Sequence, residues 1–326
     1  MRRRELIVSL GAIATMPITA HAQQGNALVI GLLGSASATV SEDIVAPFRR
    51  GLRDGGIGDG ANVVIEQRWA EGHYERLPAL AAELVRRKVS VIAAFGGNAP
   101  AQAARSATAD IPIVFVSGGE PVKDGIVASL ARPGGNITGV SWIAARLTAK
   151  RLELLHQLVP RVEKVGVLLN PAYPDSALQR QELKEAAESL HERVEIAEAR
   201  SEGEIENALA TLVRDHADAL LVANDPFFHS RAESIVALAA RYALPACYFE
   251  RAFAAAGGLA SYGASLAEVY RQAGIYTARV LKGERPADLP VLQPTNYELV
   301  INLKTAKALG LEISPVLIAR ADEVIE

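Results

Sequence analysis

The sequence predicts an α/β protein of two Rossmann-like lobes, each built on a parallel sheet. Short apolar runs rich in branched residues alternate with amphipathic helical patterns, which is typical of parallel strands joined by right-handed helical crossovers. The chain has 326 residues. This is longer than the chains that usually fold around a single hydrophobic core, so two lobes are expected. Glycine-rich and polar loops follow several strands, where open α/β sheets bind their ligands.

The first lobe is predicted from five short apolar runs. The expected strands are 27–33, 63–69, 89–95, 111–116 and 137–140. The run at 111–116 is too short for a helix and has no polar residue, which indicates a strand buried on both faces. A helix over 74–88 places its leucines and Val85 on one stripe.

The second lobe repeats this alternation after a helix at 147–159 that ends before Pro160. Its expected strands are 165–169, 194–197, 219–222 and 245–248, with helices near 176–190, 202–214 and 230–242. A strand at 259–262, a helix at 266–281 and a strand at 297–303 then suggest that the chain crosses between the lobes again. The predicted division is 27–140 plus 263–290 for lobe I, and 141–262 plus 291–326 for lobe II.

The N-terminus has the pattern of a signal peptide. Three arginines, 2–4, precede a short apolar run, 6–18, and Ala20-His21-Ala22 supplies an A-x-A cleavage pattern. The apolar run is too short for a membrane anchor. We therefore predict cleavage near Ala22 and a periplasmic mature protein starting at Gln23, with the export route left open.

The composition excludes several classes of function. Half of the residues are hydrophobic, 22% are charged and the formal net charge is -3, so there is no electrostatic case for binding nucleic acid or an anionic membrane. The single cysteine, Cys247, cannot form an internal disulfide. The histidines show no metal-ligand spacing and surface positions are expected for them; those after the signal peptide are His73, His156, His191, His216 and His229.

Catalytic motifs are also absent from the sequence. There is no G-x-S-x-G nucleophile elbow and no P-loop. The sequence therefore predicts a binding protein that needs no cofactor or metal and hydrolyses no ATP itself. Two rival classes stay open at this point: an exported enzyme on the same fold, and the ligand-sensing domain of a receptor or repressor.

Three loops at the carboxyl ends of the first lobe's strands contain small polar residues. They carry Ser35 and Ser37, then Gly97 and Asn98, then Ser117 and Gly118. Backbone N–H groups at such helix starts can approach a carboxylate. Tight turns and helix caps would explain each loop singly, but three loops at one sheet end favour a binding site.

The second lobe offers Asn170, Tyr173 and Asp225 at its own strand ends. Asp225 precedes Pro226, so it could cap a helix or pair with a ligand ammonium. Glu250 is another acidic candidate, explained equally well by a solvated helix start. Among the aromatic residues, Trp142, Tyr248 and Tyr262 suit stacking on a planar ligand or packing at a hinge.

Five segments resemble a known family. They are IPIVFVSGGEPVKDGIVASLARPGGNITGVSW, AKRLELLHQLVP, LLVANDPFF, FAAAGGLASYGAS and LKGERPADLPVLQPTNYELVINLKTAKALGLEI. They resemble the type I periplasmic substrate-binding proteins of ABC importers, in the branch that includes tryptophan and tyrosine binders.

The resemblance implies three hinge crossings, with a small polar or aromatic, amino-acid-like ligand between the lobes. It also implies a monomer that delivers the ligand to a membrane permease driven by a separate ATPase, so that the permease is the only membrane contact. An aspartate in the loop matching ANDPFF contacts the ligand amino group in the amino-acid-binding members, which favours Asp225. The complete predicted ligand-binding set is Ser35, Ser37, Gly97, Asn98, Ser117, Gly118, Trp142, Asn170, Tyr173, Asp225, Tyr248 and Tyr262.

Overall fold

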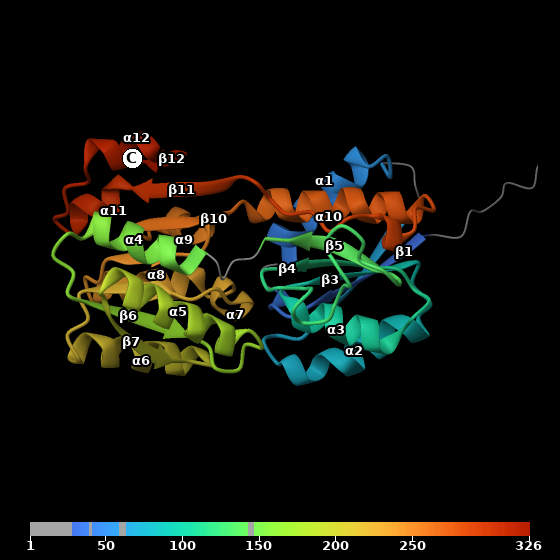
Figure 1. Cartoon of the computed structure of the whole chain (residues 1–326), viewed down its shortest axis with the longest axis horizontal. Helices are drawn as coiled ribbons and strands as arrows, with labels where there is room; N and C mark the ends of the chain where they lie inside the picture. Colours follow the sequence, from blue (N-terminus) through green and yellow to red (C-terminus); the bar gives the residue numbers. More distant parts are fainter. Residues whose placement is uncertain (1–27, 39–40, 59–62, 143–146) are drawn as a thin grey trace, which may run out of the picture.

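The structure is a computed structural model that describes residues 28–38, 41–58, 63–142 and 147–326. Two α/β lobes lie side by side along the long axis of the molecule, each around its own sheet (Figure 1). The predicted fold class is therefore confirmed. The predicted signal peptide and residues 143–146 lie outside the described residues.

The first sheet has five parallel strands in the order β2-β1-β3-β4-β5. The strands are β1 (Leu28–Gly34), β2 (Val63–Trp69), β3 (Val91–Phe95), β4 (Ile113–Ser117) and β5 (Ile137–Ser141). All residues of β3, β4 and β5 are buried, as expected for strands covered on both faces. Alternate residues of β4 enter different clusters: Val114 and Val116 join one, and Ile113 and Phe115 the other.

Helices cover both faces of this sheet. One face carries α1 (Ser41–Asp54) and α10 (Leu266–Leu281), and the other carries α2 (Leu77–Arg86) and α3 (Asn98–Ala107) (Figure 1). The predicted helix at 74–88 is divided into the 3-10 turn η2 (Tyr74–Arg76) and α2, because Pro78 begins the α-helix near its first position.

Helix α10 returns from the second half of the sequence to pack on α1. Two glycines allow this approach: a Cβ on Gly51 would lie 1.8 Å from the Arg271 carbonyl oxygen, and one on Gly274 would lie 2.2 Å from that of Phe48. After α10 the chain passes the 3-10 turn η4 (Pro286–Asp288) and rejoins the second sheet. The residue boundaries predicted for the lobes stay a proposal, which the packing of α10 supports.

The second sheet has seven strands in the order β12-β11-β10-β9-β8-β6-β7. They are β6 (Lys164–Leu169), β7 (Arg193–Glu198), β8 (Ala219–Val222), β9 (Ala246–Tyr248), β10 (Ala260–Ala264), β11 (Tyr297–Asn302) and β12 (Glu323–Ile325). All neighbours are parallel except β10 and β11. The helices are α4 (Thr148–Leu158), α5 (Ser176–Leu190), α6 (Glu202–Arg214), α7 (Pro226–His229), α8 (Ala232–Arg241), α9 (Arg251–Ala255), α11 (Leu303–Ala308) and α12 (Pro315–Arg320).

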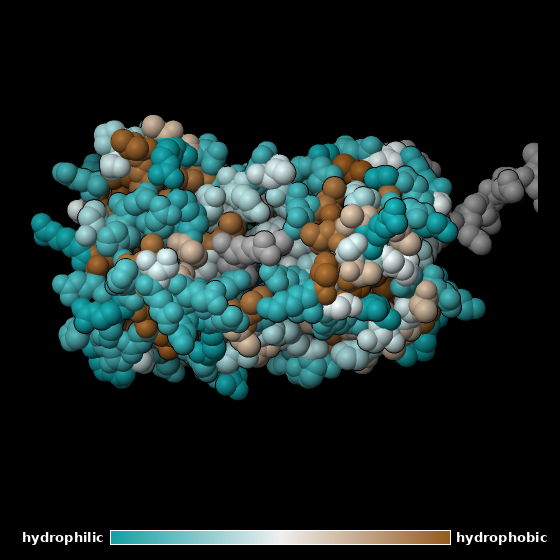
Figure 2. All heavy atoms as spheres, viewed as in Figure 1, coloured by the Kyte–Doolittle hydropathy of each residue, from teal (hydrophilic) through white to brown (hydrophobic). Residues whose placement is uncertain are grey.

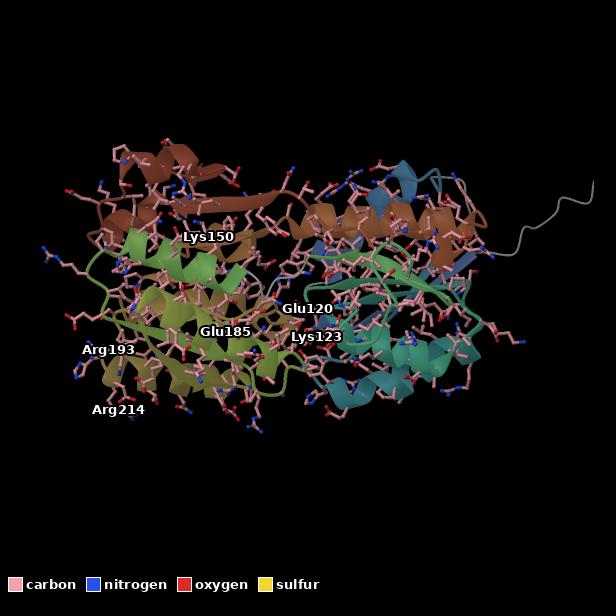
Figure 3. The ribbon with its side chains drawn as sticks, viewed as in Figure 1. Glu120, Lys123, Lys150, Glu185, Arg193 and Arg214 are labelled. Carbon is pink, nitrogen blue, oxygen red and sulfur yellow. The ribbon has the colours of Figure 1, made fainter. Side chains whose placement is uncertain are left out.

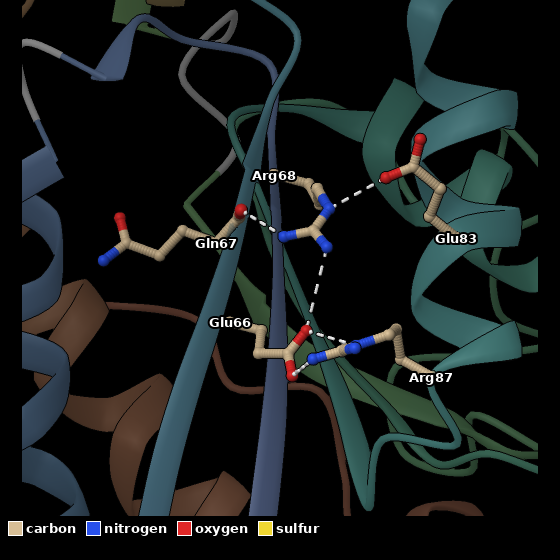
Figure 4. A network of polar contacts seen from close by, with 5 residues as sticks. All are labelled: Glu66, Gln67, Arg68, Glu83 and Arg87. Carbon is tan, nitrogen blue, oxygen red and sulfur yellow. Dashed lines mark hydrogen bonds and ion pairs between the residues drawn. The ribbon is translucent and has the colours of Figure 1, made fainter.

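Charged residues protect the exposed edge of the first sheet. On edge strand β2, Arg68 Nε lies 2.9 Å from Glu83 Oε2 of α2, and Glu66 accepts from Arg87 at 2.6 Å (Figure 4). Charges on an edge strand discourage pairing with another chain.

The surface seen in Figure 2 is mostly hydrophilic, with hydrophobic atoms gathered in patches. Among the helices of the described segments, none has both the length and the apolar character needed to cross a membrane.

Candidate functional site

A cavity lies where the carboxyl ends of the first sheet's strands meet loops of the second lobe. Its empty volume is about 500 Å³ when the open mouth is included. Its lining residues are Ala36, Ile44, Trp69, Phe95, Gly96, Gly97, Val116, Gly118, Trp142, Tyr173, Asn224, Pro226, His229, Phe249, Leu266 and Tyr270. Of the predicted set, Gly97, Gly118, Trp142 and Tyr173 therefore line it.

The loop after β3 brings backbone close to the cavity. Gly96 and Gly97 have φ values of +93° and +107°, which strongly favour glycine. A Cβ on Gly96 would lie 2.2 Å from Ser35 Oγ, and one on Gly97 would lie 3.1 Å from the Tyr173 hydroxyl oxygen. Ser35 Oγ donates to the Gly96 carbonyl at 2.6 Å. The Ser35 side chain therefore fixes the conformation of this loop. Ser37 follows β1 in the chain and is buried.

Asn98 and Ser117 are joined to each other beside this loop. Ser117 Oγ donates to Asn98 Oδ1 and accepts from the Gly119 N–H at 3.0 Å, while the Asn98 amide donates to Asp124. Both side chains are buried and neither lines the cavity. Burial raises the pKa of Asp124 despite that hydrogen bond. Glu120 and Lys123 of the same segment lie where the first lobe faces the second (Figure 3).

Asp225 is the most heavily bonded acid at the junction of the lobes. Its Oδ1 accepts from the N–H groups of Phe227 at 2.6 Å and Phe228 at 3.1 Å, so it caps α7. Its Oδ2 accepts from Asn170 at 3.2 Å and from the Tyr74 hydroxyl at 3.4 Å. Burial raises its pKa to about 6 although all these bonds favour the charged form. Asp225 lies just behind Asn224 and Pro226, which line the cavity.

Tyr74 and Tyr173 connect the two lobes. Their ring centroids are 6.0 Å apart, and Tyr74 reaches from the first lobe to Asp225 of the second. Tyr173 donates to Asp175, and burial raises the pKa of both groups. Because the contacts of Tyr74 with Asp225 and Tyr173 cross between the lobes, they depend on how closely the lobes approach.

Aromatic rings form much of the remaining wall. Phe95 and Tyr270 lie 5.2 Å apart between ring centroids; the other aromatic wall residues are Trp69, Trp142 and Phe249. Of these, the sequence interpretation included Trp142 alone. Trp69 and Phe95 are the last residues of β2 and β3, so the strand-end rule that selected the glycine loops could have found them.

Tyr248 and Tyr262 lie elsewhere. Tyr248 is buried and stacks on Phe253 at 4.7 Å, because alternation along the chain turns its neighbour Phe249 toward the cavity instead. The Tyr262 ring packs near Tyr297, with centroids 6.2 Å apart. Neither lines the cavity, and their role in ligand binding stays a prediction.

His229 and Glu250 form a mostly buried pair at the cavity. Their side chains are 12% and 4% exposed, and His229 Nδ1 is hydrogen-bonded to Glu250 Oε1. The surface position expected for His229 was therefore wrong, as was the solvated position considered for Glu250. Burial opposes the charged imidazole, but the charges of Glu250 and Asp43 prevail and raise the pKa of His229.

In the described part of the chain, no cluster of three or more acidic, histidine or cysteine residues is arranged to hold a metal.

The family model for ABC transporter substrate binding proteins matches residues 35–325, nearly all of the described chain. The chain belongs to this family. It is 31% identical over 265 residues to a tyrosine-binding protein of Clostridioides difficile strain R20291, covering 81% of this chain and 76% of the relative.

Two solved structures are similar to this chain over most of their length. One is an ABC domain from Streptococcus pneumoniae in complex with L-Trp, with 29% identity and a TM-score of 0.80. The other is a ligand-free, open substrate binding protein with adhesive properties from Clostridium difficile, with 26% identity and a TM-score of 0.64. In both cases 91% of this chain and 99% of the other chain are covered.

Membership of this family confirms two predictions. The resemblance to ABC substrate-binding proteins was correct, and so was the choice of a binding protein over an enzyme. As a substrate-binding protein, the chain needs contacts that hold a small molecule and no group that reacts with it.

Proposed function

We propose that this protein is the extracytoplasmic solute-binding component of an ABC importer and captures an aromatic amino acid between its lobes. The observation that carries the proposal is the composition of the cavity wall. Six aromatic side chains line it, glycine backbone borders one side, and the buried carboxyl group of Asp225 lies behind Asn224 and Pro226.

The cavity and the residues around it offer a binding partner for each part of an aromatic amino acid. Asp225 would pair with the ammonium group, as the aspartate at the matching position does in amino-acid-binding members of the family. The carboxylate would be received at the amino-terminal end of α3, where the Gly96-Gly97 loop admits close backbone approach and the helix dipole favours an anion. The ring would be buried among Phe95, Trp142 and Phe249.

The relation between the lobes supports capture by closure. Tyr74 of the first lobe touches Asp225 and Tyr173 of the second. The chain is also more similar to the L-Trp complex, with a TM-score of 0.80, than to the ligand-free open structure, with 0.64. A ligand that contacts both lobes favours the arrangement in which both sets of contacts form.

The remaining parts of the proposal follow from the family. A closed form would present both lobes to a membrane permease that is driven by a separate ATPase. The protein would act as a monomer in the periplasm after cleavage near Ala22. Detection of Gln23 as the first residue of periplasmic protein would support export, and an intact Met1 there would contradict it.

The binding function is tested by calorimetry and scattering on the mature protein. We expect at least one of L-tryptophan, L-tyrosine and L-phenylalanine to bind, and the radius of gyration to decrease at saturation. Native mass spectrometry of protein taken from its own periplasm would identify a ligand carried through purification. The amino-acid proposal is wrong if all three fail to bind, and closure is wrong if saturation leaves the scattering profile unchanged.

A further inference from the structure

His229, which is paired with the buried Glu250, lines the cavity, as does Gly97 of the glycine loop. Ile44 of α1 and Tyr270 of α10 line the cavity together with His229, and those helices cover one face of the first sheet. Gly97 begins α3, which covers the other face. An amino acid whose head group lies at Gly97 would therefore extend its side chain toward His229.

One nitrogen of the His229 imidazole is hydrogen-bonded to Glu250, and the other can bind a ligand. Nδ1 is bonded to Glu250, and no described residue bonds to Nε2. A carboxylate on one ring nitrogen fixes the ring's orientation and its tautomer. Nε2 then accepts a hydrogen bond when the ring is neutral and donates one when it is protonated.

The groups around His229 favour the protonated form. Glu250 is bonded to it directly, Asp43 of α1 contributes a second negative charge, and both act against burial to raise its pKa. Tyr270 of α10 is also close to Glu250, whose charge adds to burial in raising the tyrosine's pKa. This end of an otherwise aromatic cavity is thus polar.

The hydrogen-bonding requirement of Nε2 distinguishes aromatic side chains. A phenol hydroxyl satisfies it in either protonation state, because the oxygen both donates and accepts. An indole N–H satisfies only the neutral imidazole, and a phenyl ring satisfies neither form. Leaving such a polar group unpaired in a closed site costs affinity.

We infer that His229, positioned by Glu250, selects ligands that carry a hydroxyl group at the far end of an aromatic ring, with L-tyrosine preferred over L-phenylalanine. The inference rests on the proposed function, since it assumes an amino-acid head group at Gly97 and Asp225. It adds the residue that sets side-chain specificity within that function.

The test is the ratio of dissociation constants for L-phenylalanine and L-tyrosine, measured by calorimetry on the mature chain. We expect the unaltered protein to prefer L-tyrosine by about tenfold or more. In His229→Phe the ratio should fall below about threefold through loss of L-tyrosine affinity. The matched control is His156→Phe, which breaks a similar pair with Glu192 at 2.7 Å on the surface and should keep the ratio.

Glu250→Gln tests the positioning role, since it keeps the size of the side chain and removes the charge. Without that charge the His229 pKa should be lower. Because an indole N–H pairs only with the neutral imidazole, the pH below which L-tryptophan loses affinity relative to L-tyrosine should therefore move to lower pH. A variant in which Glu250 only stabilised the fold would show an altered thermal midpoint with the same pH profile.

The outcomes are distinct. If the unaltered protein binds both amino acids equally, or if His229→Phe keeps the tyrosine preference, the inference is overturned while the proposed function stands. The first of these comparisons needs no variant, so a folding defect in His229→Phe cannot leave the question open. If none of the aromatic amino acids binds, both the proposed function and the inference that rests on it are wrong.

Discussion

Asp225→Asn separates the two roles that the structure gives to this side chain. The N–H groups of Phe227 and Phe228 both bond to Oδ1, and asparagine is about as good an N-cap as aspartate. The amide nitrogen would then replace Oδ2, which accepts from Asn170 at 3.2 Å. The Tyr74 hydroxyl, which donates to Oδ2 at 3.4 Å, can turn and accept from the new amide group. Loss of the Asn170 hydrogen bond alone should therefore lower the free energy of unfolding by about 1 kcal/mol.

The effect of Asp225→Asn on ligand binding should be larger. Removing a charge-assisted hydrogen bond to an ammonium costs about 1.5–3 kcal/mol, which is a loss in affinity of roughly 10- to 150-fold. Calorimetry with the aromatic amino acid that binds most tightly measures this directly. Repeating the titration with its deaminated analogue should show no additional loss, because that ligand has no ammonium to pair.

A matched control is available at Asp218. Its Oδ2 accepts from the backbone N–H groups of Glu163 and Lys164, both at 2.9 Å, on the surface of the second lobe. Asp218→Asn should therefore leave ligand affinity unchanged. If Asp225→Asn also binds the amino acid within twofold of the unaltered protein, then Asp225 is a cap and the ammonium site must be sought elsewhere.

Three further predictions follow from the same contacts. The pKa of Asp225 is raised to about 6, so the negative charge that would pair with the ligand ammonium is present above that pH and is lost below it. Ligand affinity measured by calorimetry should therefore fall about tenfold between pH 7 and pH 5. An affinity that does not change with pH would contradict this. Asp175→Asn removes a buried charge from the junction of the lobes, so scattering should show a smaller radius of gyration without ligand; an unchanged radius would contradict it. Gly274→Ala places a methyl group 2.2 Å from the Phe48 carbonyl and should lower the free energy of unfolding by about 1–3 kcal/mol in urea, whereas the control Gly203→Ala, with open space around it, should not.

Most of the fold could be predicted because its signals are local. A run such as 111–116 shows by length and composition that it is a strand buried on both faces, and β4 (Ile113–Ser117) is fully buried. Errors concern short elements. The helix predicted near 230–242 is α8 (Ala232–Arg241), but a separate short helix, α7 (Pro226–His229), precedes it because Asp225 and Pro226 begin a helix four residues earlier.

The site was less predictable because it depends on how two lobes meet. The glycine loop after β3 was recognisable from its position, and it lines the cavity. The contact of Tyr74 with Asp225 joins residues 151 positions apart, and no local pattern encodes it. Much of the aromatic wall was missed. Trp69 and Phe95 could have been found from their places at strand ends, whereas Phe249, read along the chain, is indistinguishable from a core residue.

The electrostatics of the junction explain why a ligand, and in particular its charge, would decide closure. Asp124 of the first lobe and Asp175 of the second interact unfavourably across the junction, and burial raises the pKa of both, as it does for Asp225. Closing the empty protein therefore removes three carboxyl groups from water, and among the described residues the one positive charge that acts on them is Lys123, next to Asp124 in the chain. A neutral aromatic molecule would gain burial against the wall and leave this cost in place. An amino acid brings an ammonium group to the same junction and offsets part of it, so its interaction differs most between the open and closed forms, which is the condition for a ligand to drive closure.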